Sequence, residues 1–234
     1  MVGGTPATGA FLDRLGPADR AVVLSAGRPR RYRAGETIFV AGDPGNFVVL
    51  ITEGRAKVTA PSPTGSETVL SLRGPGDLLG ELTAIDDEPT PRVATVVAVD
   101  AVLCRVVRVE EFRAILAGHT AIALELMRMV ASRLRTSDRR LVEFGAYDIT
   151  RRVALLLADM AASQGRPSPS GTGVTVPGGL SQDDLAGLVG GSRESVARAL
   201  GALRSLGLVS TGRRRVVVHD LDRLRDYAVD LPGV

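Results

Sequence analysis

Two short helix patterns separated by a pair of glycines lie between residues 180 and 206, and they constrain the fold more than any other part of the chain. Ser181 and Ser192 each precede one pattern and are suited to be N-caps, because a serine hydroxyl accepts a hydrogen bond from an unpaired amide of the first helical turn. Gly190 and Gly191 permit a sharp turn, since glycine adopts backbone conformations that other residues avoid. The segment therefore predicts a helix-turn-helix.

The second helix of this segment has an apolar face and a charged end. Helical spacing predicts a buried stripe made of Val196, Ala199, Leu200, Leu203 and Leu206. The charged end carries Arg193, Glu194, Ser195 and Arg198. Arginine pairs bidentately with guanine, and glutamate accepts a hydrogen bond from the amino group of cytosine, both in the major groove. An ordinary helix with a solvated charged face is the alternative, but the two capped helices around a glycine turn favour DNA binding.

A basic hairpin is expected directly after this helix. Gly207 is expected to end the helix as its C-cap, and Thr211-Gly212 to form the turn between strands at residues 208–210 and 216–218. Arginines gather at or just after the tip, at Arg213, Arg214 and Arg215. Such a hairpin is typical of a wing, whose arginines contact phosphates and position the protein without reading base sequence.

These residues resemble the winged helix-turn-helix of the Crp/Fnr family, the catabolite-activator-type regulators of bacteria. The resemblance extends over nearly the whole chain after about residue 10, and it implies an α+β protein. The parts it implies are a flexible tail (1–10), a cyclic-nucleotide-binding β-roll (11–118), a long dimerisation helix (119–146) and a winged helix-turn-helix (147–234). The DNA-binding residues we expect are Ser181, Ser192, Arg193, Glu194, Ser195, Arg198, Arg213 and Arg214.

The composition is compatible with two modest domains and a connector, because the chain has 234 residues of which 44% are hydrophobic. The formal net charge is only +3, but arginine dominates the basic residues and the sequence pI is about 9.6, which suits a polyanionic partner. Cys104 is the single cysteine, which argues against disulfides and fits a cytoplasmic protein. His119 and His219 lack metal-ligand spacing, so no metal site is expected. We expect no membrane span, because no apolar run reaches roughly 18–20 residues, and no signal peptide.

From Arg30 to Val109, short β-rich runs alternate with glycines. Runs of this kind predict an antiparallel all-β unit. They lie at Thr37–Val40, Phe47–Ile51, Ala56–Thr59, Thr68–Leu72, Ala94–Val99 and Val102–Val107. A cupin-like jelly roll has a similar pattern, but it needs clustered metal-binding histidines, and this segment contains no histidine.

The tripeptide Gly80-Glu81-Leu82, followed further along by Arg92-Val93, resembles the phosphate-binding cassette of the family. The resemblance assigns Glu81 to a ribose 2′-hydroxyl and Arg92 to a phosphate, which a guanidinium binds as a fork. Family members that bind cAMP carry Ser or Thr in place of Val93, and the lost hydrogen bond costs roughly 1.5–3 kcal/mol unless a nearby hydroxyl compensates. The alternative is a Glu81–Arg92 salt bridge in a roll that has lost its ligand.

The segment from Thr120 to about Gly145 is rich in helix-forming residues. Its apolar residues follow a heptad pattern, which predicts a two-stranded coiled coil. The expected seam is Met127, Val130, Leu134, Ser137, Leu141 and Phe144. A helix packed only on its own domain is the alternative. The next helix is expected to begin at Ile149, followed by a loop from Ser163 to Gly179 with a small hairpin around Val174–Val176.

The resemblance also places Ser137 and Asp138 near the base of the nucleotide, where the Asp138 carboxylate would accept from an adenine amino group. An ion pair between Arg133 and Asp138 of the partner subunit is an equal alternative. The full set of expected nucleotide-binding residues is Gly80, Glu81, Leu82, Arg92, Val93, Ser137 and Asp138.

The resemblance implies a homodimeric, ligand-responsive transcription regulator that binds double-stranded DNA at an inverted repeat of TGTGA-like half-sites. The expected effector is cAMP, no other cofactor is required, and RNA polymerase is an expected partner. The alternatives are a regulator that is nucleotide-independent or senses another effector, an architectural DNA-binding protein, and, remotely, a cyclic-nucleotide-regulated enzyme. No phosphate-binding loop, nucleophile elbow or metal-ligand spacing is present, so we expect no catalytic residues.

Overall fold

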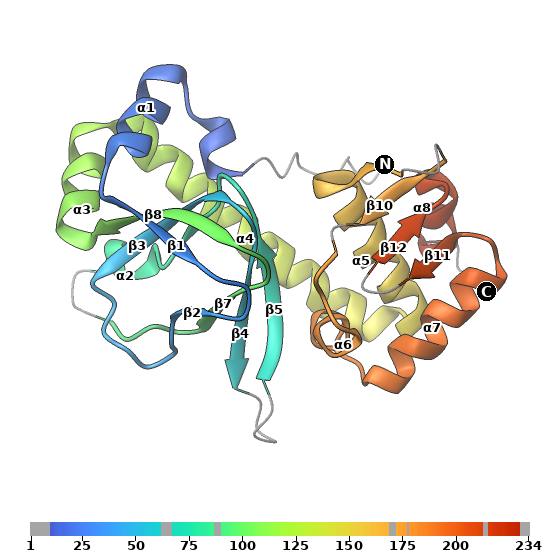
Figure 1. Ribbon diagram of the computed structural model, residues 1–234. Coiled ribbons are helices and arrows are strands. Elements are labelled where there is room, and N and C mark those ends of the chain that lie inside the picture. Colours follow the sequence, from blue (N-terminus) through green and yellow to red (C-terminus); the bar gives the residue numbers. More distant parts are fainter. Residues whose placement is uncertain are drawn as a thin grey trace. The chain divides into compact units, whose positions relative to one another are not determined.

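The computed structural model describes residues 10–61, 67–86, 90–168, 172–176, 178–212 and 215–229. The chain divides into two compact units, Met1–Thr136 and Ser137–Val234. Their boundary lies within one continuous helix, α4 (Thr120–Ala146), which confirms the long helix expected from the sequence (Figure 1). The expected flexible tail lies outside the described residues except for Ala10.

The first unit is a β-roll of two four-stranded antiparallel sheets, with strand orders β1-β8-β3-β6 and β2-β7-β4-β5. The strands are β1 (Arg28–Tyr32), β2 (Thr37–Phe39), β3 (Phe47–Glu53), β4 (Ala56–Pro61), β5 (Glu67–Arg73), β6 (Leu78–Leu79), β7 (Thr95–Ala98) and β8 (Val102–Arg108). The predicted all-β unit is therefore confirmed, and β1 and β6 are additional strands.

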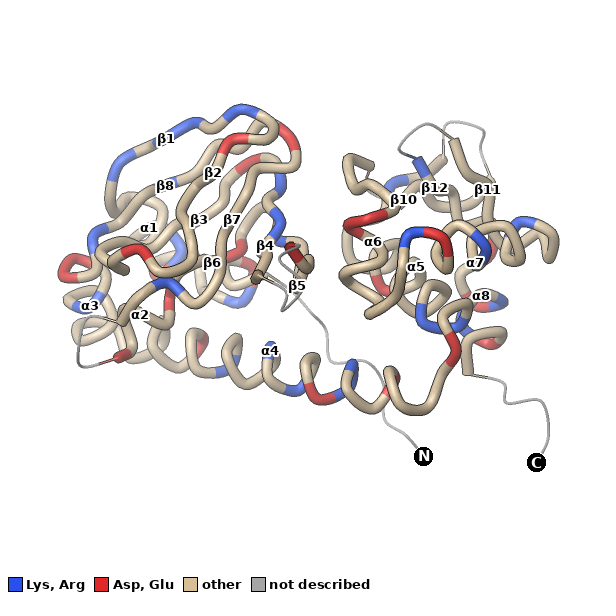
Figure 2. The backbone as a smooth tube through the Cα atoms, turned by 90° about the horizontal axis from the view of Figure 1, so that it is seen from below, with Lys and Arg blue, Asp and Glu red and all other residues tan. Residues whose placement is uncertain are grey.

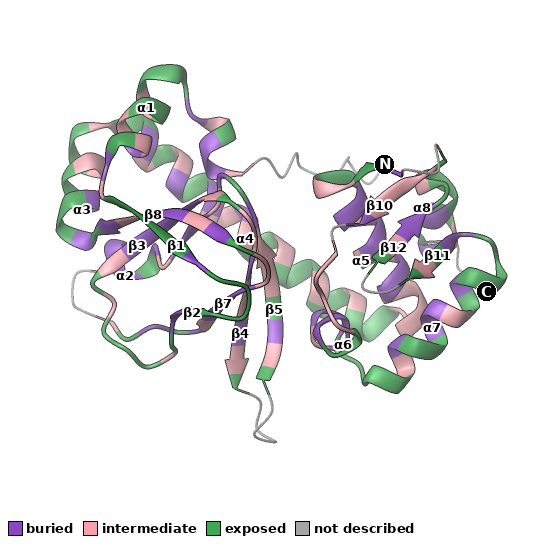
Figure 3. Ribbon diagram, viewed as in Figure 1, coloured by how far each residue is buried: buried purple, intermediate pink, exposed green. Residues whose placement is uncertain are grey.

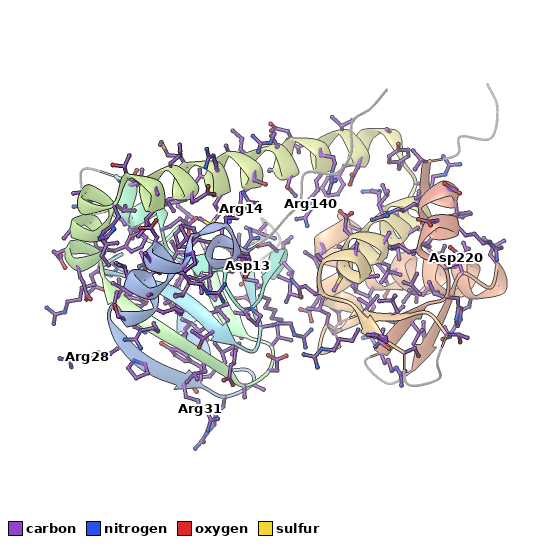
Figure 4. All side chains as sticks on the ribbon, turned by 90° about the horizontal axis from the view of Figure 1, so that it is seen from above. Asp13, Arg14, Arg28, Arg31, Arg140 and Asp220 are labelled. Atoms are coloured by element: carbon purple, nitrogen blue, oxygen red, sulfur yellow. The ribbon has the colours of Figure 1, made fainter. Side chains whose placement is uncertain are left out.

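The sequence pattern did not predict strand β1 because three of its five residues are arginine. It is an edge strand of its sheet and pairs with β8. Its first four residues are exposed and only Tyr32 is buried. The positive charge follows the strand (Figure 2), and Arg28 and Arg31 point away from the roll (Figure 4).

The core of the roll unit is divided by the alternation of side chains along β3. Val48 and Leu50 pack in a cluster with the helices, while Val49 and Ile51 pack in the interior of the roll. All four are 0% exposed, as expected for a strand covered on both faces (Figure 3). The helices of this unit are a 3₁₀ turn η1 (Phe11–Arg14), α1 (Pro17–Ser25), α2 (Leu82–Ile85), α3 (Val109–Gly118) and the first part of α4.

Helix α4 uses one face to cover the roll. Ile122, Leu126 and Met129 are buried in the helix-side cluster, and Val130 packs against it. These residues recur every three or four positions, the spacing of one helix face. Within the described residues, no single helix is long and apolar enough to cross a membrane, although α3 and α4, which meet at 113°, pass that test together.

The second unit contains a four-stranded sheet of order β11-β12-β10-β9 and a group of helices. After the end of α4, its elements are α5 (Ile149–Gln164), β9 (Arg166–Pro167), β10 (Val174–Val176), α6 (Gln182–Val189), α7 (Arg193–Ser205), β11 (Val209–Gly212), β12 (Arg215–Val218) and α8 (Leu221–Val229). Helices α6, α7 and α8 pack on α5, whose Leu157 is fully buried. The arrangement is the expected winged helix-turn-helix.

One detail of the expected wing is wrong. Thr211 and Gly212 belong to strand β11, where they pair with Val216 and Arg215, and do not form the turn. The two strands are thus longer than the apolar residues alone indicated. Arg213 and Arg214, which connect them, lie outside the described residues.

Candidate DNA interface and effector site

Both helices of the helix-turn-helix begin with a capping box, as the serines predicted. The Ser181 hydroxyl accepts a hydrogen bond from the Asp184 amide at 3.1 Å, and the Asp184 carboxylate accepts one from the Ser181 amide at 2.8 Å. Ser192 and Ser195 make the corresponding pair of bonds at 3.2 and 2.9 Å. Reciprocal caps satisfy amides that a helix start leaves unpaired. These hydroxyls therefore set the helix starts, and their contact with DNA stays a prediction.

The glycine turn is required by close packing as well as by backbone conformation. Gly190 lies in the left-handed region, with φ 62 and ψ 46. A Cβ atom there would lie 3.2 Å from the ring of Phe144, and one at Gly191 would lie 2.7 Å from Ile149 Cδ1. The Arg152 guanidinium stacks on the same Phe144 ring, 5.2 Å from its centroid. The turn is thus seated on the end of α4 and the start of α5.

Helix α7 buries the face expected from its sequence, with one exception. Val196, Ala199, Leu200 and Leu203 are buried, but Leu206 is 48% exposed. The prediction for Leu206 was wrong because the helix ends at Ser205, so Leu206 is the C-cap and departs from the helical periodicity. Gly207, expected as the C-cap, follows it in the left-handed conformation with φ 66.

The opposite side of α7 presents its charged residues to solvent. Arg193, Glu194 and Arg198 are all exposed. Hydrogen bonds donated by its own amide and by the Ser192 hydroxyl lower the pKa of Glu194, so its carboxylate is ionised and able to accept from a base at neutral pH. Arg193 lies 4.0 Å from Asp183 of α6, a contact between two exposed side chains that water screens strongly.

The wing is attached to the rest of the unit by arginine side chains. Arg204 of α7 donates to the Thr211 hydroxyl of β11 at 2.9 Å. Arg215 lies in β12 and donates to the Ser168 and Thr175 hydroxyls at 3.3 and 3.5 Å, so it spans the sheet. Arg213 and Arg214 remain predictions, because they lie outside the described residues.

In the roll, the acidic residue of the cassette is paired with helix α4. Glu81 is 6% exposed, and its carboxylate accepts from Arg133 Nη1 at 2.6 Å. Arg133 Nη2 also donates to the Leu78 carbonyl at 2.7 Å. The alternative Glu81–Arg92 salt bridge is therefore wrong. The alternative ion pair between Arg133 and Asp138 of the partner subunit is also unsupported, because Arg133 points to its own roll.

Arg92, the arginine of the cassette, is almost fully buried. It is 4% exposed, and it donates to the carbonyls of Phe47 at 2.5 Å and Gly80 at 3.2 Å. Its guanidinium packs against two aromatic rings, 4.3 Å from the centroid of Phe39 and 4.6 Å from that of Phe47. Burial lowers its pKa, and the nearby charges of Glu81 and Asp43 partly oppose the shift. Phe39 and Phe47 carried no signal beyond that of ordinary strand residues.

Gly80 is the residue that lets Arg92 lie where it does. Gly80 has φ 73, and a Cβ atom there would lie 2.2 Å from Arg92 Nη1. Gly80 and Glu81 precede α2, whose first residue, Leu82, is 40% exposed. Val93, next to Arg92, is 73% exposed and accessible to a ligand. The nearby Thr95 hydroxyl accepts from the Ala41 amide at 3.0 Å.

Helix α4 carries an apolar stripe that is largely exposed. Met127, Leu134 and Leu141 are 61%, 62% and 67% exposed, and Phe144 is 38% exposed. Leu124 and Val142 are also exposed and were not part of the expected seam. Val130 instead packs on the roll, and Ser137 and Asp138 are exposed. Among the described residues, no group of His, Cys, Asp and Glu side chains is placed to hold a metal ion.

Comparison with known proteins supports both units. Residues 29–119 match the cyclic nucleotide-binding domain model, and residues 151–227 match that of the Crp-like helix-turn-helix domain. The chain is 30% identical over 208 residues to the CRP-like cAMP-activated global transcriptional regulator of Mycobacterium tuberculosis, covering 89% of this chain and 91% of that protein. The chain belongs to the Crp/Fnr family.

Other Crp/Fnr proteins agree with this assignment. The cyclic AMP receptor protein of Thermus thermophilus is 30% identical over 217 residues, which cover 93% of this chain and 95% of that protein. The solved structure of the c-di-GMP-responsive global regulator CLP from Xanthomonas campestris has the same fold, with a TM-score of 0.75 at 22% identity over 88% of this chain and 100% of that chain. This Crp/Fnr chain is thus a DNA-binding transcription regulator with a cyclic nucleotide-binding domain.

Proposed function

We propose that the protein is a homodimeric transcription regulator whose DNA binding is controlled by a cyclic nucleotide, with cAMP as the effector. The observation that carries the proposal is the buried cluster of Gly80, Glu81 and Arg92, which Arg133 joins to α4. A ligand held by Glu81 and Arg92 would contact Glu81, the residue that is paired with Arg133 of α4. Helix α4 also carries the apolar stripe. Ligand binding would then change the relative populations of conformations that differ in the arrangement of α4.

The charges of the cluster suit a nucleotide that has one phosphate and a free ribose hydroxyl. Glu81 supplies an acceptor, and Arg92 supplies a cation whose side chain, among the described residues, donates hydrogen bonds only to neutral oxygens. The M. tuberculosis relative is named as cAMP-activated and the T. thermophilus relative as a cyclic AMP receptor, which makes cAMP the first ligand to test. The same proposal assigns Leu82, Val93, Ser137 and Asp138 to the ligand site.

A second copy of this chain is the proposed occupant of the stripe on α4. Met127, Leu134 and Leu141 are seven residues apart, and Leu124 lies three residues before Met127. This spacing is that of a coiled-coil seam, and exposed leucines at such positions are covered when two helices pair. The expected seam is therefore retained in part, with Leu124 in addition and Val130 turned toward the roll.

The proposed DNA target is an inverted repeat of TGTGA-like half-sites about one helical turn apart. Arg193 and Arg198 would contact guanines, and Glu194 the cytosine opposite one of them. Arg213 and Arg214 would contact phosphates. RNA polymerase is the proposed further partner and the cytoplasm the proposed compartment, and we infer no enzymatic activity.

A nucleotide-independent regulator is the second candidate, and it is favoured by one observation. Arg92 already donates to a carbonyl and packs against an aromatic ring, while Val93 provides no hydroxyl. Calorimetric titration with cAMP, cGMP and c-di-GMP separates the two candidates. Binding of cAMP that is lost in Arg92→Ala and retained in the exposed control Arg20→Ala supports the proposal. No heat with any of the three at millimolar concentration would favour the second candidate.

A further inference from the structure

Arg92 packs against two phenylalanines that come from different sheets of the roll. Phe39 ends β2, and Phe47 begins β3. Their rings lie edge to face, with centroids 6.1 Å apart and planes at 72°. The guanidinium lies within 4.6 Å of both ring centroids, inside the roughly 6 Å range of cation–π attraction. We call Phe39 and Phe47 the aromatic clamp.

The clamp holds a cation that makes no ion pair with any described carboxylate. Among the described residues, the hydrogen-bond acceptors of Arg92 are the Phe47 and Gly80 carbonyls and the Thr83 hydroxyl, and no ion pair of Arg92 is found. Glu81, the acidic residue of the cassette motif, is paired with Arg133. Aromatic faces therefore supply attraction that elsewhere in proteins a buried counter-ion supplies.

This arrangement holds the Arg92 guanidinium away from the exposed surface at which a ligand would bind. Arg92 is 4% exposed, whereas Val93 beside it is 73% exposed. The Nε atom of Arg92 is buried and has no hydrogen-bond partner among the residues that the structure describes. A phosphate at the exposed surface can form a bidentate contact only if an edge of the guanidinium leaves its carbonyls and its ring faces.

We propose that Phe39 and Phe47 determine the affinity of the effector site for its ligand. They hold the Arg92 guanidinium in a buried position, and the guanidinium must leave that position to bind the ligand phosphate. The clamp residues are positioning residues, which act through Arg92 and do not touch the ligand. The proposal rests on the proposed function, since it concerns the same cyclic-nucleotide site. It predicts that weakening the clamp tightens ligand binding, whereas loss of a merely structural core residue does not.

The test compares Phe39→Leu and Phe47→Leu with the matched control Phe112→Leu by calorimetric titration with cAMP. Phe112 is 1% exposed and lies in the helix-side cluster, away from Arg92. Each clamp variant is expected to bind cAMP about two- to thirty-fold more tightly than the wild type, the range of one cation–π contact. The control is expected to keep the wild-type affinity. Unchanged or weaker binding in both clamp variants, with wild-type affinity in the control, would overturn the proposal.

A second measurement follows Arg92 directly in the full-length protein. Its Nε–H resonance, assigned by its loss in Arg92→Lys, should be shifted by the aromatic rings in the free wild type and should move when cAMP is added. In Phe47→Leu the resonance of the free protein should already have lost part of the ring shift. A resonance that is unshifted in the free wild type would overturn the proposal.

The two failures are distinguishable. If the wild type binds cAMP and the clamp variants match it, only the clamp proposal fails. If no cyclic nucleotide binds the wild type but Phe47→Leu gains binding, the clamp proposal is supported in a strong form. If none of the proteins binds any cyclic nucleotide, the proposed function fails and the clamp proposal fails with it, while the Arg92 resonance still reports whether the stacking exists.

Discussion

Arg133 of helix α4 donates to Glu81 of the cassette with an Nη1–Oε1 distance of 2.6 Å, and the two side chains are 21% and 8% exposed. The same guanidinium lies 3.9 Å from Asp77 and caps the Leu78 carbonyl. The pair thus fastens α4 to the segment that is expected to bind the effector. Its buried partner, Glu81, would be left without a cation if Arg133 were removed.

Arg133→Ala should therefore destabilise the roll by about 1–3 kcal/mol, the cost of leaving a buried hydrogen-bonding group unsatisfied. Urea denaturation of the wild type and the variant measures the difference. The control is Arg128→Ala, which removes a pair with Glu125 on the same helix in which the arginine is 56% exposed. An exposed pair contributes roughly 0–1 kcal/mol, so equal losses in the two variants would contradict the assignment.

Leu134→Asp should separate the proposed dimer, because it places a charge in the middle of the exposed stripe on α4. Sedimentation at micromolar concentration measures the mass. The control, Leu206→Asp, changes a leucine that is 48% exposed and lies outside α4, and it should leave the mass unchanged. A monomeric wild type, with or without cAMP, would refute the coiled coil.

Val93→Ser should tighten the binding of cAMP about tenfold to a hundredfold, because it restores one hydroxyl–phosphate hydrogen bond of roughly 1.5–3 kcal/mol. The exposure of Val93 leaves room for this contact. Val40→Ser is the control, since Val40 is also exposed in the roll and no site is assigned to it. Equal calorimetric affinities for the wild type and Val93→Ser would remove Val93 from the site.

Arg198→Ala should weaken binding to the selected half-site by roughly 1–3 kcal/mol and relax the preference at one base pair. Selection from random duplexes, performed with the wild type and the variant, measures both effects. Arg223→Ala on α8 is an exposed control that should retain the preference. Arg213→Ala should instead weaken all sequences similarly and lower the salt slope by about one. An unrelated selected motif would refute the base contacts.

Gly190→Ala should destabilise the second unit by about 1–2 kcal/mol, because a side chain is strained in the left-handed region, and its Cβ also meets the Phe144 ring. Gly212→Ala is the matched control, since a Cβ there meets nothing within 4 Å and the backbone is in a strand. Thermal unfolding compares the two. A similar midpoint for both variants would show that the turn tolerates a side chain.

Local signals in the sequence predicted the parts of the fold that depend on neighbouring residues. Ser181 and Ser192 marked two helix starts because capping is decided within three residues. The prediction that Leu206 is buried was wrong, because helical periodicity alone does not show at which residue a helix ends. Arg133 fitted a heptad position, but its partner is Glu81, 52 residues away. Only the tertiary structure brings such residues together.

The ligand cluster shows the same limit. The resemblance to a motif identified Gly80, Glu81 and Arg92, and the structure adds the residues that contact each of them. Phe39 and Phe47 are typical strand residues in a β-rich pattern, and nothing in their spacing distinguishes a ring against a cation from a ring against other apolar groups. Their contact with Arg92 depends on two sheets meeting, which no short pattern encodes.

The arginine-rich strand β1 has a consequence for self-association. An uncovered edge strand offers unpaired amides and carbonyls to any second chain, and long flat edges lead to aggregation. Two copies of β1 that paired edge to edge would bring Arg28, Arg30 and Arg31 against like charges, which destabilises cross-strand pairs. Pro29 removes one amide donor from the same strand. The roll therefore resists growth into a continuous intermolecular sheet.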